Sequence, residues 1–286
     1  MTSTQVLVLG GTGYVGSNVS RHLSSLGFDV KALGRKECDL TSTKGRDRLV
    51  DLLSEKDSHI VFVAALTRSI SETSESCFYN IKQVESLIYA CGKVAPLSVC
   101  FISAADVYGH GGRQVSELGS YTVENPYGMY KLFSENILKF SLKSICPLTI
   151  LRCSGVFGGY GDKTSLIFKF AKAIATKRKI ILHSTGEVYR DYVPISLLSK
   201  VIELVIKSPS NDTFNVSCGK DISIIKLVKF IEESIEGVAI LSLLDDVRSR
   251  DFSLSLSNKK LLKKFPSIVD FDLLKEVGLF VKSIHR

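Results

Sequence analysis

A glycine-rich turn directly after an apolar strand constrains this chain more than any other feature. Residues 5–9 predict a strand, which runs into Gly10-Gly11-Thr12-Gly13-Tyr14-Val15-Gly16 and then into a helical pattern over 16–26. Glycines allow a tight turn and let backbone amides approach a pyrophosphate, which the positive end of the helix attracts. The order strand, turn, helix favours a dinucleotide site over a purely structural turn. Its predicted contacts are Gly10, Thr12, Gly13, Tyr14, Val15 and Gly16.

The first half of the chain alternates short apolar runs with helical patterns, as βαβ units around a parallel sheet do. The expected strands are 5–9, 28–33, 59–65, 97–103 and 148–152, and the expected helices are 16–26, around 46–53, 76–94 and 126–144. Later helices are expected at 165–176, 195–207 and 222–235, after a glycine-rich loop at 154–163. The pattern predicts an α/β fold with a Rossmann-type doubly wound parallel sheet. We expect that domain at 1–160 and a small C-terminal α/β substrate-binding lobe at 161–286, some of whose elements could return to the sheet.

Composition excludes several other classes of protein. Hydrophobic residues make up 45% of the 286 residues and there are only 6 Pro, which excludes disordered and collagen-like chains. No apolar run approaches the ~20 residues of a membrane helix, and no basic region precedes an apolar stretch at the start. The seven Cys are widely spaced and form no Cys-x-x-Cys pair. We therefore expect free thiols, no metal site, no membrane partner and a cytoplasmic location.

The net charge of +8 is concentrated in one segment. Residues 163–207 contain nine Lys and Arg against three acids. Because no aromatic and basic residues interleave in a stripe, this charge favours an anionic small substrate over nucleic acid.

The end of the second expected strand bears on the cofactor. Where an acid would bind the adenosine ribose of NAD, the chain has Gly34, followed by Arg35 and Lys36. A missing carboxylate beside two cations suits the 2′-phosphate of NADP, so NADP(H) is predicted ahead of NAD(H). Asp39 is placed to accept a hydrogen bond from the adenine amino group; the alternative is that Asp39 or Thr41 caps the next helix.

A tyrosine and a lysine open the helix expected at 126–144. Tyr127 and Lys131 are four residues apart, so they lie on one helix face, one turn from each other. A neighbouring ammonium favours the phenolate form of a tyrosine, which makes the pair a candidate acid–base catalyst.

With these motifs the chain resembles the extended short-chain dehydrogenases/reductases of the nucleotide-sugar epimerase/dehydratase/reductase group. The matching motifs, in the order of that family, are the Gly10/Gly13/Gly16 turn, Val63-Ala64-Ala65, the Ser103-Ala104-Ala105-Asp106-Val107-Tyr108-Gly109 segment, residues 126–131, Val156-Phe157-Gly158 and Arg190-Asp191-Tyr192. The resemblance covers nearly the whole chain and is specific for the family rather than for one reaction.

The resemblance implies roles for individual residues. Tyr127 would exchange a proton with a sugar oxygen, and Lys131 would bond the nicotinamide ribose and tune Tyr127. Further implied cofactor contacts are Leu40, Ala64, Ala65 and Leu66. The implied substrate-binding residues are Ser165, Arg190, Arg248 and Asp251, with Arg190 on the diphosphate.

Three positions depart from the family pattern. Ala104 stands where the family has a catalytic Ser or Thr, so the neighbouring Ser103 becomes the candidate substitute if its hydroxyl turns inward. Asp106 stands where dehydratases of the family carry a Glu and GDP-fucose synthase a Cys, so it is a candidate acid–base group; the alternative is an Asp that stabilises a turn. Gly155 replaces a frequent substrate-binding Asn.

The short span from 34 to 43 and the two cations resemble the reductase branch of the family. The leading hypothesis is an NADPH-dependent reductase of a nucleotide-diphosphate 4-keto-deoxy sugar, with Tyr127 as proton donor. One alternative is an NAD-dependent nucleotide-sugar epimerase or dehydratase. Another is a catalytically weak NADP(H)-binding sensor or scaffold, motivated by Ala104 and Gly155. The resemblance also implies a homodimer that packs the two long helices of each protomer together.

Overall fold

The structure is a computed structural model that describes residues 4–182, 186–243, 252–268 and 271–285. The chain divides into two compact units. The first comprises residues 1–107, 123–152 and 199–214, and the second comprises 108–122, 153–198 and 215–286. The chain therefore passes between the units several times, where the sequence suggested one division near residue 160.

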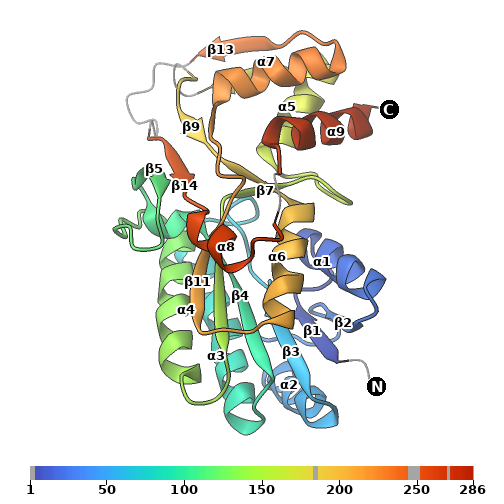
Figure 1. The fold of residues 1–286 in the computed structure, drawn as a ribbon, viewed down its shortest axis with the longest axis vertical. Coiled ribbons are helices and arrows are strands. Elements are labelled where there is room, and N and C mark those ends of the chain that lie inside the picture. Colours follow the sequence, from blue (N-terminus) through green and yellow to red (C-terminus); the bar gives the residue numbers. More distant parts are fainter. Residues whose placement is uncertain (1–3, 183–185, 244–251, 269–270, 286) are drawn as a thin grey trace. The chain divides into compact units, whose positions relative to one another are not determined.

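Six strands form the central sheet in the order β11-β6-β4-β3-β1-β2 (Figure 1). Their bounds are Gln5–Leu9 for β1, Asp29–Leu33 for β2, Ser58–Phe62 for β3, Ser98–Ala104 for β4, Leu148–Cys153 for β6 and Asp212–Val216 for β11. β1 pairs in parallel with both β2 and β3, and β3 pairs in parallel with β4. β1, β3 and β4 are buried along their whole length, as in a parallel sheet covered on both faces.

Helices cover this sheet. They are α1 (Tyr14–Ser25), α2 (Thr43–Glu55), α3 (Ser74–Lys93), α4 (Pro126–Leu142) and α6 (Ile195–Lys207). α2, α3 and α4 contribute Leu49, Leu87 and Leu138 to one apolar core with Leu7 and Phe101 of the sheet. Because the chain moves from β1 to β2 in one direction and from β2 to β3 in the other, right-handed crossovers place α1 on the opposite face from α2.

Polar side chains fix where the helices of the first unit begin. Ser42 accepts a hydrogen bond from Gly45 N and so caps α2. Thr73 and Ser76 form a reciprocal capping box at the start of α3. Asn125 caps α4, and the proline that follows it has no N–H to leave unsatisfied.

The second unit consists of short strands and helices. A 3-10 turn, Ala105–Tyr108, follows β4. The elements of the second unit are β5 (Gly112–Val115), β7 (Gly155–Phe157), α5 (Leu166–Ala175), β8 (Lys179–Leu182), β9 (Tyr189–Arg190), β10 (Tyr192–Pro194), β12 (Ile222–Ser223), α7 (Ile224–Ile235), β13 (Ile240–Leu243), β14 (Leu254–Leu256), α8 (Lys259–Lys264) and α9 (Leu273–His285). α5, α7 and α9 share a core that includes Phe157, Ile174, Ile231 and Val277.

The predicted α/β fold with a doubly wound sheet is confirmed. Most expected elements have slightly different bounds, and two of these differences have a clear cause. The strand expected at 59–65 ends at Phe62, because the N–H groups of Val63 and Ala64 both turn to the carbonyl of Leu9. The helix expected at 222–235 begins at Ile224, since the two residues before it pair with β9. Within the described part of the chain, no helix has the length and apolar character that crossing a membrane requires.

Candidate active site

The glycine-rich turn brings three backbone segments together at the end of β1. A Cβ on Gly10, whose φ is +85°, would lie 2.7 Å from the backbone nitrogen of Ala64. A Cβ on Gly11 would lie 2.6 Å from Cα of Ala32, and one on Gly16 would clash with the carbonyl of Gly10. The N-cap of α1 is Gly13, so no side chain caps the start of that helix. This bare cradle at a helix N-terminus fits the pyrophosphate of a dinucleotide.

Ala64, Ala65 and Leu66 follow β3. The buried side-chain amide of Asn80 binds the backbone of Leu66. Asn80 of α3 is 1% exposed and accepts from Leu66 N at 2.7 Å while its Nδ2 donates to Leu66 O at 3.0 Å. Sequence reasoning missed Asn80, for which the only signal was a polar residue on the apolar face of a helix.

The end of β2 contains a carboxylate that the sequence analysis did not place there. Gly34 N donates to Oε2 of Glu37 at 2.9 Å. A Cβ on Gly34 would clash with the side chain of Thr12, which explains the glycine at this position. Arg35 places its guanidinium carbon 5.4 Å from the ring centroid of Tyr79 in α3.

The side chain of Asp39 accepts hydrogen bonds from Thr41 and does not cap a helix. Its Oδ1 accepts from the hydroxyl of Thr41 at 2.7 Å and from Thr41 N at 3.0 Å, and these hydrogen bonds lower the pKa of Asp39. Neither residue caps α2, because Ser42 does so. The side chain of Leu40 is 5% exposed and belongs to the core under α2 and α3.

The structure brings Tyr127 and Lys131 together on α4. Lys131 is 2% exposed, and its Nζ donates to the carbonyl of Ile102 at 2.5 Å. The same Nζ lies 5.4 Å from the ring centroid of Tyr127 and 4.8 Å from that of Phe101. A buried ammonium beside a phenol ring stabilises the phenolate, as an acid–base tyrosine requires.

Ser103 has a buried hydrogen-bond partner on the same helix. Its hydroxyl donates to Oε1 of Glu135 at 2.6 Å, and Glu135 in turn forms an ion pair with Arg152. All three side chains are at most 2% exposed. The hydroxyl of Ser103 thus belongs to the hydrogen-bond network of the buried ion pair. Its role in place of the missing catalytic hydroxyl stays a prediction. Ala104 itself is the last residue of β4 and is 7% exposed.

Asp106 lies in the turn after β4, beside the start of α4. Its Oδ1 is 2.8 Å from Nη1 of Arg68 and 3.4 Å from Nδ2 of Asn125, the cap of α4. Arg68 also reaches Glu72, at 3.0 Å. The sequence analysis missed Arg68, which is not part of any of the motifs recognised there. The carboxylate of Asp106 thus forms an ion pair with Arg68 and also contacts Asn125, which lies two residues before Tyr127.

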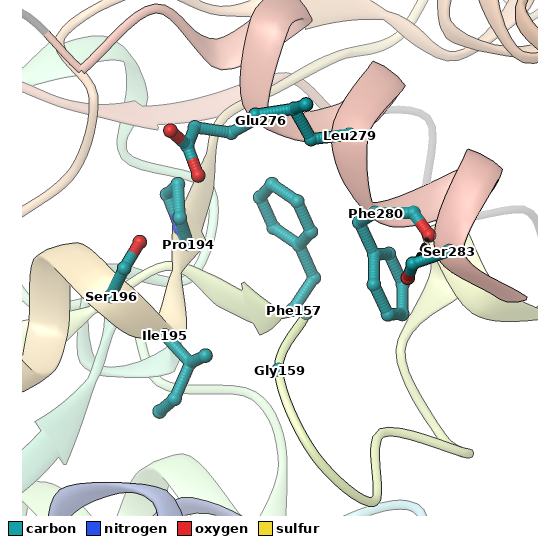
Figure 2. A pocket seen from close by; sticks show the side chains of 10 residues that line it. Phe157, Gly159, Pro194, Ile195, Ser196, Glu276, Leu279, Phe280 and Ser283 are labelled. Carbon is teal, nitrogen blue, oxygen red and sulfur yellow. Dashed lines mark hydrogen bonds between the residues drawn. The ribbon is translucent and has the colours of Figure 1, made fainter. Parts of the chain in front are cut away.

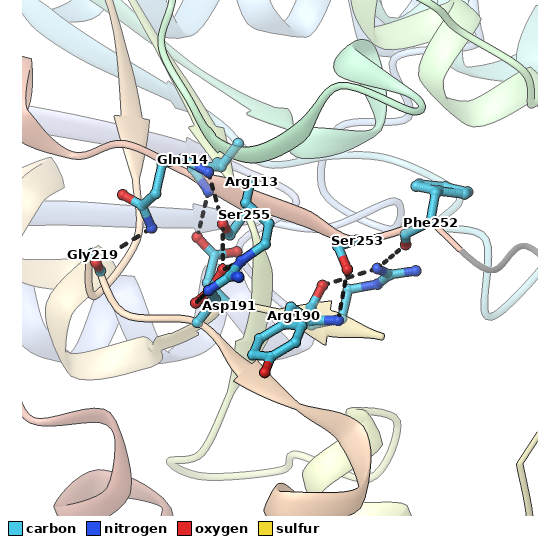
Figure 3. Close-up of polar contacts among 11 residues, drawn as sticks. Arg113, Gln114, Arg190, Asp191, Gly219, Phe252, Ser253 and Ser255 are labelled. Carbon is cyan, nitrogen blue, oxygen red and sulfur yellow. Dashed lines mark hydrogen bonds and ion pairs between the residues drawn. The ribbon is translucent and has the colours of Figure 1, made fainter. Parts of the chain in front are cut away.

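Arg190 lies in the second unit (Figure 3). Its Nη1 donates to the carbonyls of Tyr189, at 3.0 Å, and Phe252. A second guanidinium, that of Arg113, lies 4.0 Å from the ring centroid of Tyr189 and forms two hydrogen bonds with Asp221, at 2.7 and 2.9 Å. The guanidinium groups of Arg190 and Arg113 therefore both lie at the short strand β9.

Asp191 and Tyr192, which follow Arg190 in its motif, contact other parts of the second unit. Asp191 is buried and accepts from Leu256 N at 2.8 Å; burial raises its pKa to about 7. Tyr192 packs on Gly155, where a Cβ would lie 3.1 Å from its ring. This contact accounts for the glycine in place of the family's Asn.

The hydroxyl of Ser165 has local partners. It donates to Asp162 at 2.6 Å and accepts from Phe168 N at 3.1 Å, which caps α5. The structure thus gives Ser165 a capping role. Arg248 and Asp251 lie outside the described residues.

A cavity of about 280 Å³ opens in the second unit (Figure 2). The rings of Phe157 and Phe280, 6.1 Å apart, and the side chain of Glu276 line it. Among its described lining residues there is none predicted for catalysis or binding. The described residues also contain no group of His, Cys, Asp or Glu that could hold a metal ion.

Residues 6–217 match the family model described as "NAD dependent epimerase/dehydratase family". The chain belongs to this family. One relative is a dTDP-4-dehydro-6-deoxyglucose reductase of Escherichia coli, 24% identical over 98% of this chain and 97% of that protein. An uncharacterised UDP-glucose epimerase of Bacillus subtilis is 28% identical over 54% of this chain, which spans half the length of that protein.

A UDP-glucose 4-epimerase of Thermotoga maritima, solved with UDP-glucose, has the same fold. It is 20% identical, superposes with a TM-score of 0.87, and each chain covers 98% of the other. Membership in the epimerase/dehydratase family therefore agrees with the recognised motifs. Reductases and epimerases are both among the relatives, so the family does not by itself decide the reaction.

Proposed function

We propose that this protein reduces the keto carbon of a nucleotide-diphosphate 4-keto-deoxy sugar, with a nicotinamide cofactor as hydride source. The observation that carries the enzymatic part is the buried Nζ of Lys131 between the carbonyl of Ile102 and the ring of Tyr127. Burying an ammonium is costly unless it is compensated, so a site that keeps one beside a phenol is suited to proton transfer.

We assign the following roles to residues of this chain. The turn at Gly10 and Gly16 and the start of α1 would hold the pyrophosphate. Tyr127 would give its proton to the sugar oxygen, and Lys131 would stabilise the phenolate that remains. The carbonyl of Ile102 fixes the direction of the ammonium. The bound cofactor supplies the hydride.

One observation supports reduction over epimerisation. β2 ends at Leu33 and α2 begins at Thr43, which leaves the compact connection that resembles the reductase branch.

Asp106 bears on the dehydratase alternative. The carboxylate of Asp106 forms an ion pair with Arg68 at 2.8 Å. This contact supports the alternative in which Asp106 stabilises its turn, and with it the reductase over the dehydratase.

A sensor or scaffold without turnover is the second alternative. Ala104 cannot donate the usual hydrogen bond, and the loss of one such donor slows a reaction by roughly 10²–10³. Such a loss weakens catalysis without abolishing it. The glycine at 155, the other departure, has a packing reason in Tyr192.

The proposed reaction takes its hydride from either NADH or NADPH. Arg35 and Lys36 support NADPH through their charge, whereas Glu37 opposes a phosphate at the same turn. For the substrate, we propose that Arg190 binds the diphosphate, with Arg248 and Asp251 as further contacts.

A homodimer through α3 and α4 is part of the proposal. Phe78 of α3 is 66% exposed, and Phe140 of α4 is 82% exposed. Met129 and Phe133 of α4 are about half exposed. Large apolar side chains on neighbouring helices support burial against a second copy.

The test is turnover of dTDP-4-dehydro-6-deoxyglucose with NADPH or NADH, against UDP-glucose as epimerase substrate. We expect stoichiometric cofactor oxidation with the keto sugar. Tyr127→Phe should lower kcat at least 10²-fold while the Kd of the cofactor stays within about twofold. Tyr130→Phe is the matched control, because the buried Tyr130 hydroxyl has no hydrogen-bond partner among the described residues, and it should retain activity.

Three results would contradict the proposal. Epimerisation of UDP-glucose without net cofactor oxidation, by protein that copurifies with tightly bound NAD, would favour an epimerase. Cofactor binding without turnover of any keto-sugar nucleotide would favour the scaffold. Unchanged turnover in Tyr127→Phe would remove Tyr127 as proton donor.

A further inference from the structure

The guanidinium of Arg190 is oriented by backbone carbonyls. Its Nη1 donates to the carbonyls of Tyr189, at 3.0 Å, and Phe252, and its guanidinium carbon lies 5.0 Å from the ring centroid of Phe252. A neutral carbonyl orients a cation without cancelling its charge, so the group stays suited to an anionic ligand. The direction of the guanidinium therefore depends on where the backbone of Tyr189 lies.

The strand that contains Arg190 is very short. β9 has two residues, Tyr189 and Arg190, which pair with Ser223 and Ile222 of β12, and Tyr189 N donates to the hydroxyl of Ser253 at 2.9 Å. Neighbouring residues of a strand face opposite sides of the sheet, so the ring of Tyr189 lies on the other side from the side chain of Arg190. Contacts to that ring therefore fix β9 from the side that Arg190 does not occupy.

Arg113 of β5 packs against the ring of Tyr189 (Figure 3). Its guanidinium carbon lies 4.0 Å from the ring centroid, and its Nε and Nη2 donate to the two carboxylate oxygens of Asp221 at 2.7 and 2.9 Å. Two hydrogen bonds to one carboxylate fix the plane of a guanidinium, whereas a single bond leaves it free to turn. The carboxylate of Asp221 thus holds the flat cation against the ring.

Asp221 is itself held by a further strand. Its side chain is 9% exposed and accepts from the hydroxyl of Ser255 in β14 at 2.9 Å. The same hydroxyl accepts from Gln114 N of β5 at 2.9 Å. The hydrogen bonds from Arg113 and Ser255 hold the pKa of Asp221 below its usual value, so the carboxylate stays charged at neutral pH. Asp221 therefore joins β5 and β14 at the start of β12.

We infer that Asp221 is a positioning residue for Arg190: it orients Arg113, Arg113 holds the ring of Tyr189, and β9 then presents Arg190 to the diphosphate. The inference rests on the proposed role of Arg190 toward a nucleoside diphosphate. Neither Arg113 nor Asp221 belongs to a motif recognised in the sequence. Their relation to Arg190 arises only in the packed sheet.

The test is calorimetry of the full-length protein with dTDP and UDP, each compared with its nucleoside so that the contribution of the diphosphate is isolated. Asp221→Asn keeps the shape of the side chain but loses the charge that aligns Arg113. We expect it to weaken binding of the diphosphates about tenfold and to leave that of the nucleosides within about twofold. Charge attraction alone predicts the opposite sign, because the variant removes a negative charge near an anion.

Two results of this comparison would overturn the inference. One is unchanged or tighter binding of the diphosphates by Asp221→Asn. The other is an equal loss for the nucleosides, because that would mean a general disruption of the fold. If Asp221→Asn does not fold, Arg113→Lys decides in the same assay, since it keeps the charge but lacks the planar fork and should weaken the diphosphates to the same extent.

A double variant separates positioning from a merely structural role. Arg190→Met removes the guanidinium that Asp221 directs. In that background Asp221→Asn should cause no further change in the Kd of the diphosphates, because both substitutions disable the same contact. Fully additive losses would contradict the inference.

Glu55→Gln is the matched control. Glu55 is an acid at the end of α2, paired with Lys31 and Arg48, so the substitution removes the same charge from ion pairs of the first unit. Its Kd values should stay within about twofold of those of the wild type. A loss as large as that in Asp221→Asn would count against the role of Asp221.

Binding separates this inference from the proposed reaction. The expected losses without turnover of any keto-sugar nucleotide would contradict the reaction and retain the role of Asp221. Turnover with additive losses would do the reverse. Failure of the wild type to bind either diphosphate would overturn both the inference and the proposed role of Arg190.

Discussion

Arg152 and Glu135 form an ion pair inside the first unit, with Nη2 2.6 Å from Oε2 and each side chain 1% exposed. Nε of Arg152 adds a bond of 2.9 Å to the other carboxylate oxygen, which also accepts from Ser103. The pair joins α4, which contains Tyr127 and Lys131, to β6 of the sheet. It therefore ties α4 to the central sheet.

Removal of one charge from this pair should destabilise the protein strongly. Glu135→Gln leaves the guanidinium of Arg152 buried without a counter-charge, which costs about 3–5 kcal/mol in the free energy of unfolding. Urea denaturation checks this value. Ser103→Ala removes one hydrogen bond to the carboxylate and should cost about 2 kcal/mol, with kcat nearly unchanged in the folded protein. A large fall in kcat with unchanged stability would show that Ser103 is catalytic after all.

Restoration of the family's hydroxyl tests the most unusual position of the site. Ala104→Ser adds one oxygen at the end of β4, where Ala104 is 7% exposed. We expect kcat to stay the same or to rise, up to the roughly 10²–10³ that one oxyanion donor provides. Steady-state kinetics with the keto-sugar nucleotide measure it. A large drop in kcat would instead show that the methyl group shapes the sugar pocket.

Glu203 should make the first unit sensitive to acid. Burial alone would raise its pKa, but hydrogen bonds from Lys207 at 2.7 Å, Lys200 at 3.1 Å and His22 at 3.0 Å lower the pKa to about 2. Because the folded pKa is below the unfolded value, the stabilisation is complete above pH ~4.5 and is lost as the pH falls toward 2.

The size of this effect follows from the pKa difference. We expect Glu203 to contribute about 2 kcal/mol at pH 7, after allowance for the solvent around the half-exposed Lys200 and Lys207. Glu203→Gln should lower stability by this amount at pH 7 and by much less at pH 2.5. Urea midpoints at the two pH values provide the measurement. An equal loss at both would mean that charge is not the cause.

Local patterns in the sequence were sufficient to predict the glycine-rich turn and the placement of Tyr127 and Lys131 on one helix face. The glycines from Gly10 to Gly16 and the spacing of Tyr127 and Lys131 act within one turn or one helix, where the backbone period fixes which residues are neighbours. The alternation of apolar runs and helical patterns predicted the doubly wound sheet for the same reason. The ends of these elements differ, as at Phe62, after which the N–H groups of Val63 and Ala64 turn to the carbonyl of Leu9 in β1.

Tertiary structure decided what the polar side chains bind. Ser103 and Glu135 are 32 residues apart, and Asn80 is 14 residues from the Leu66 it holds, so no local period relates them. Glu37 is only three residues from Gly34, but the direction of its side chain depends on how Thr12 and the turn pack together. The sequence alone determined the fold class and the placement of Tyr127 and Lys131 on one helix face. Only the packed structure determined that Ser103 donates to Glu135 and that Asn80 binds the backbone of Leu66, because a side chain's partner depends on segments that only folding brings together.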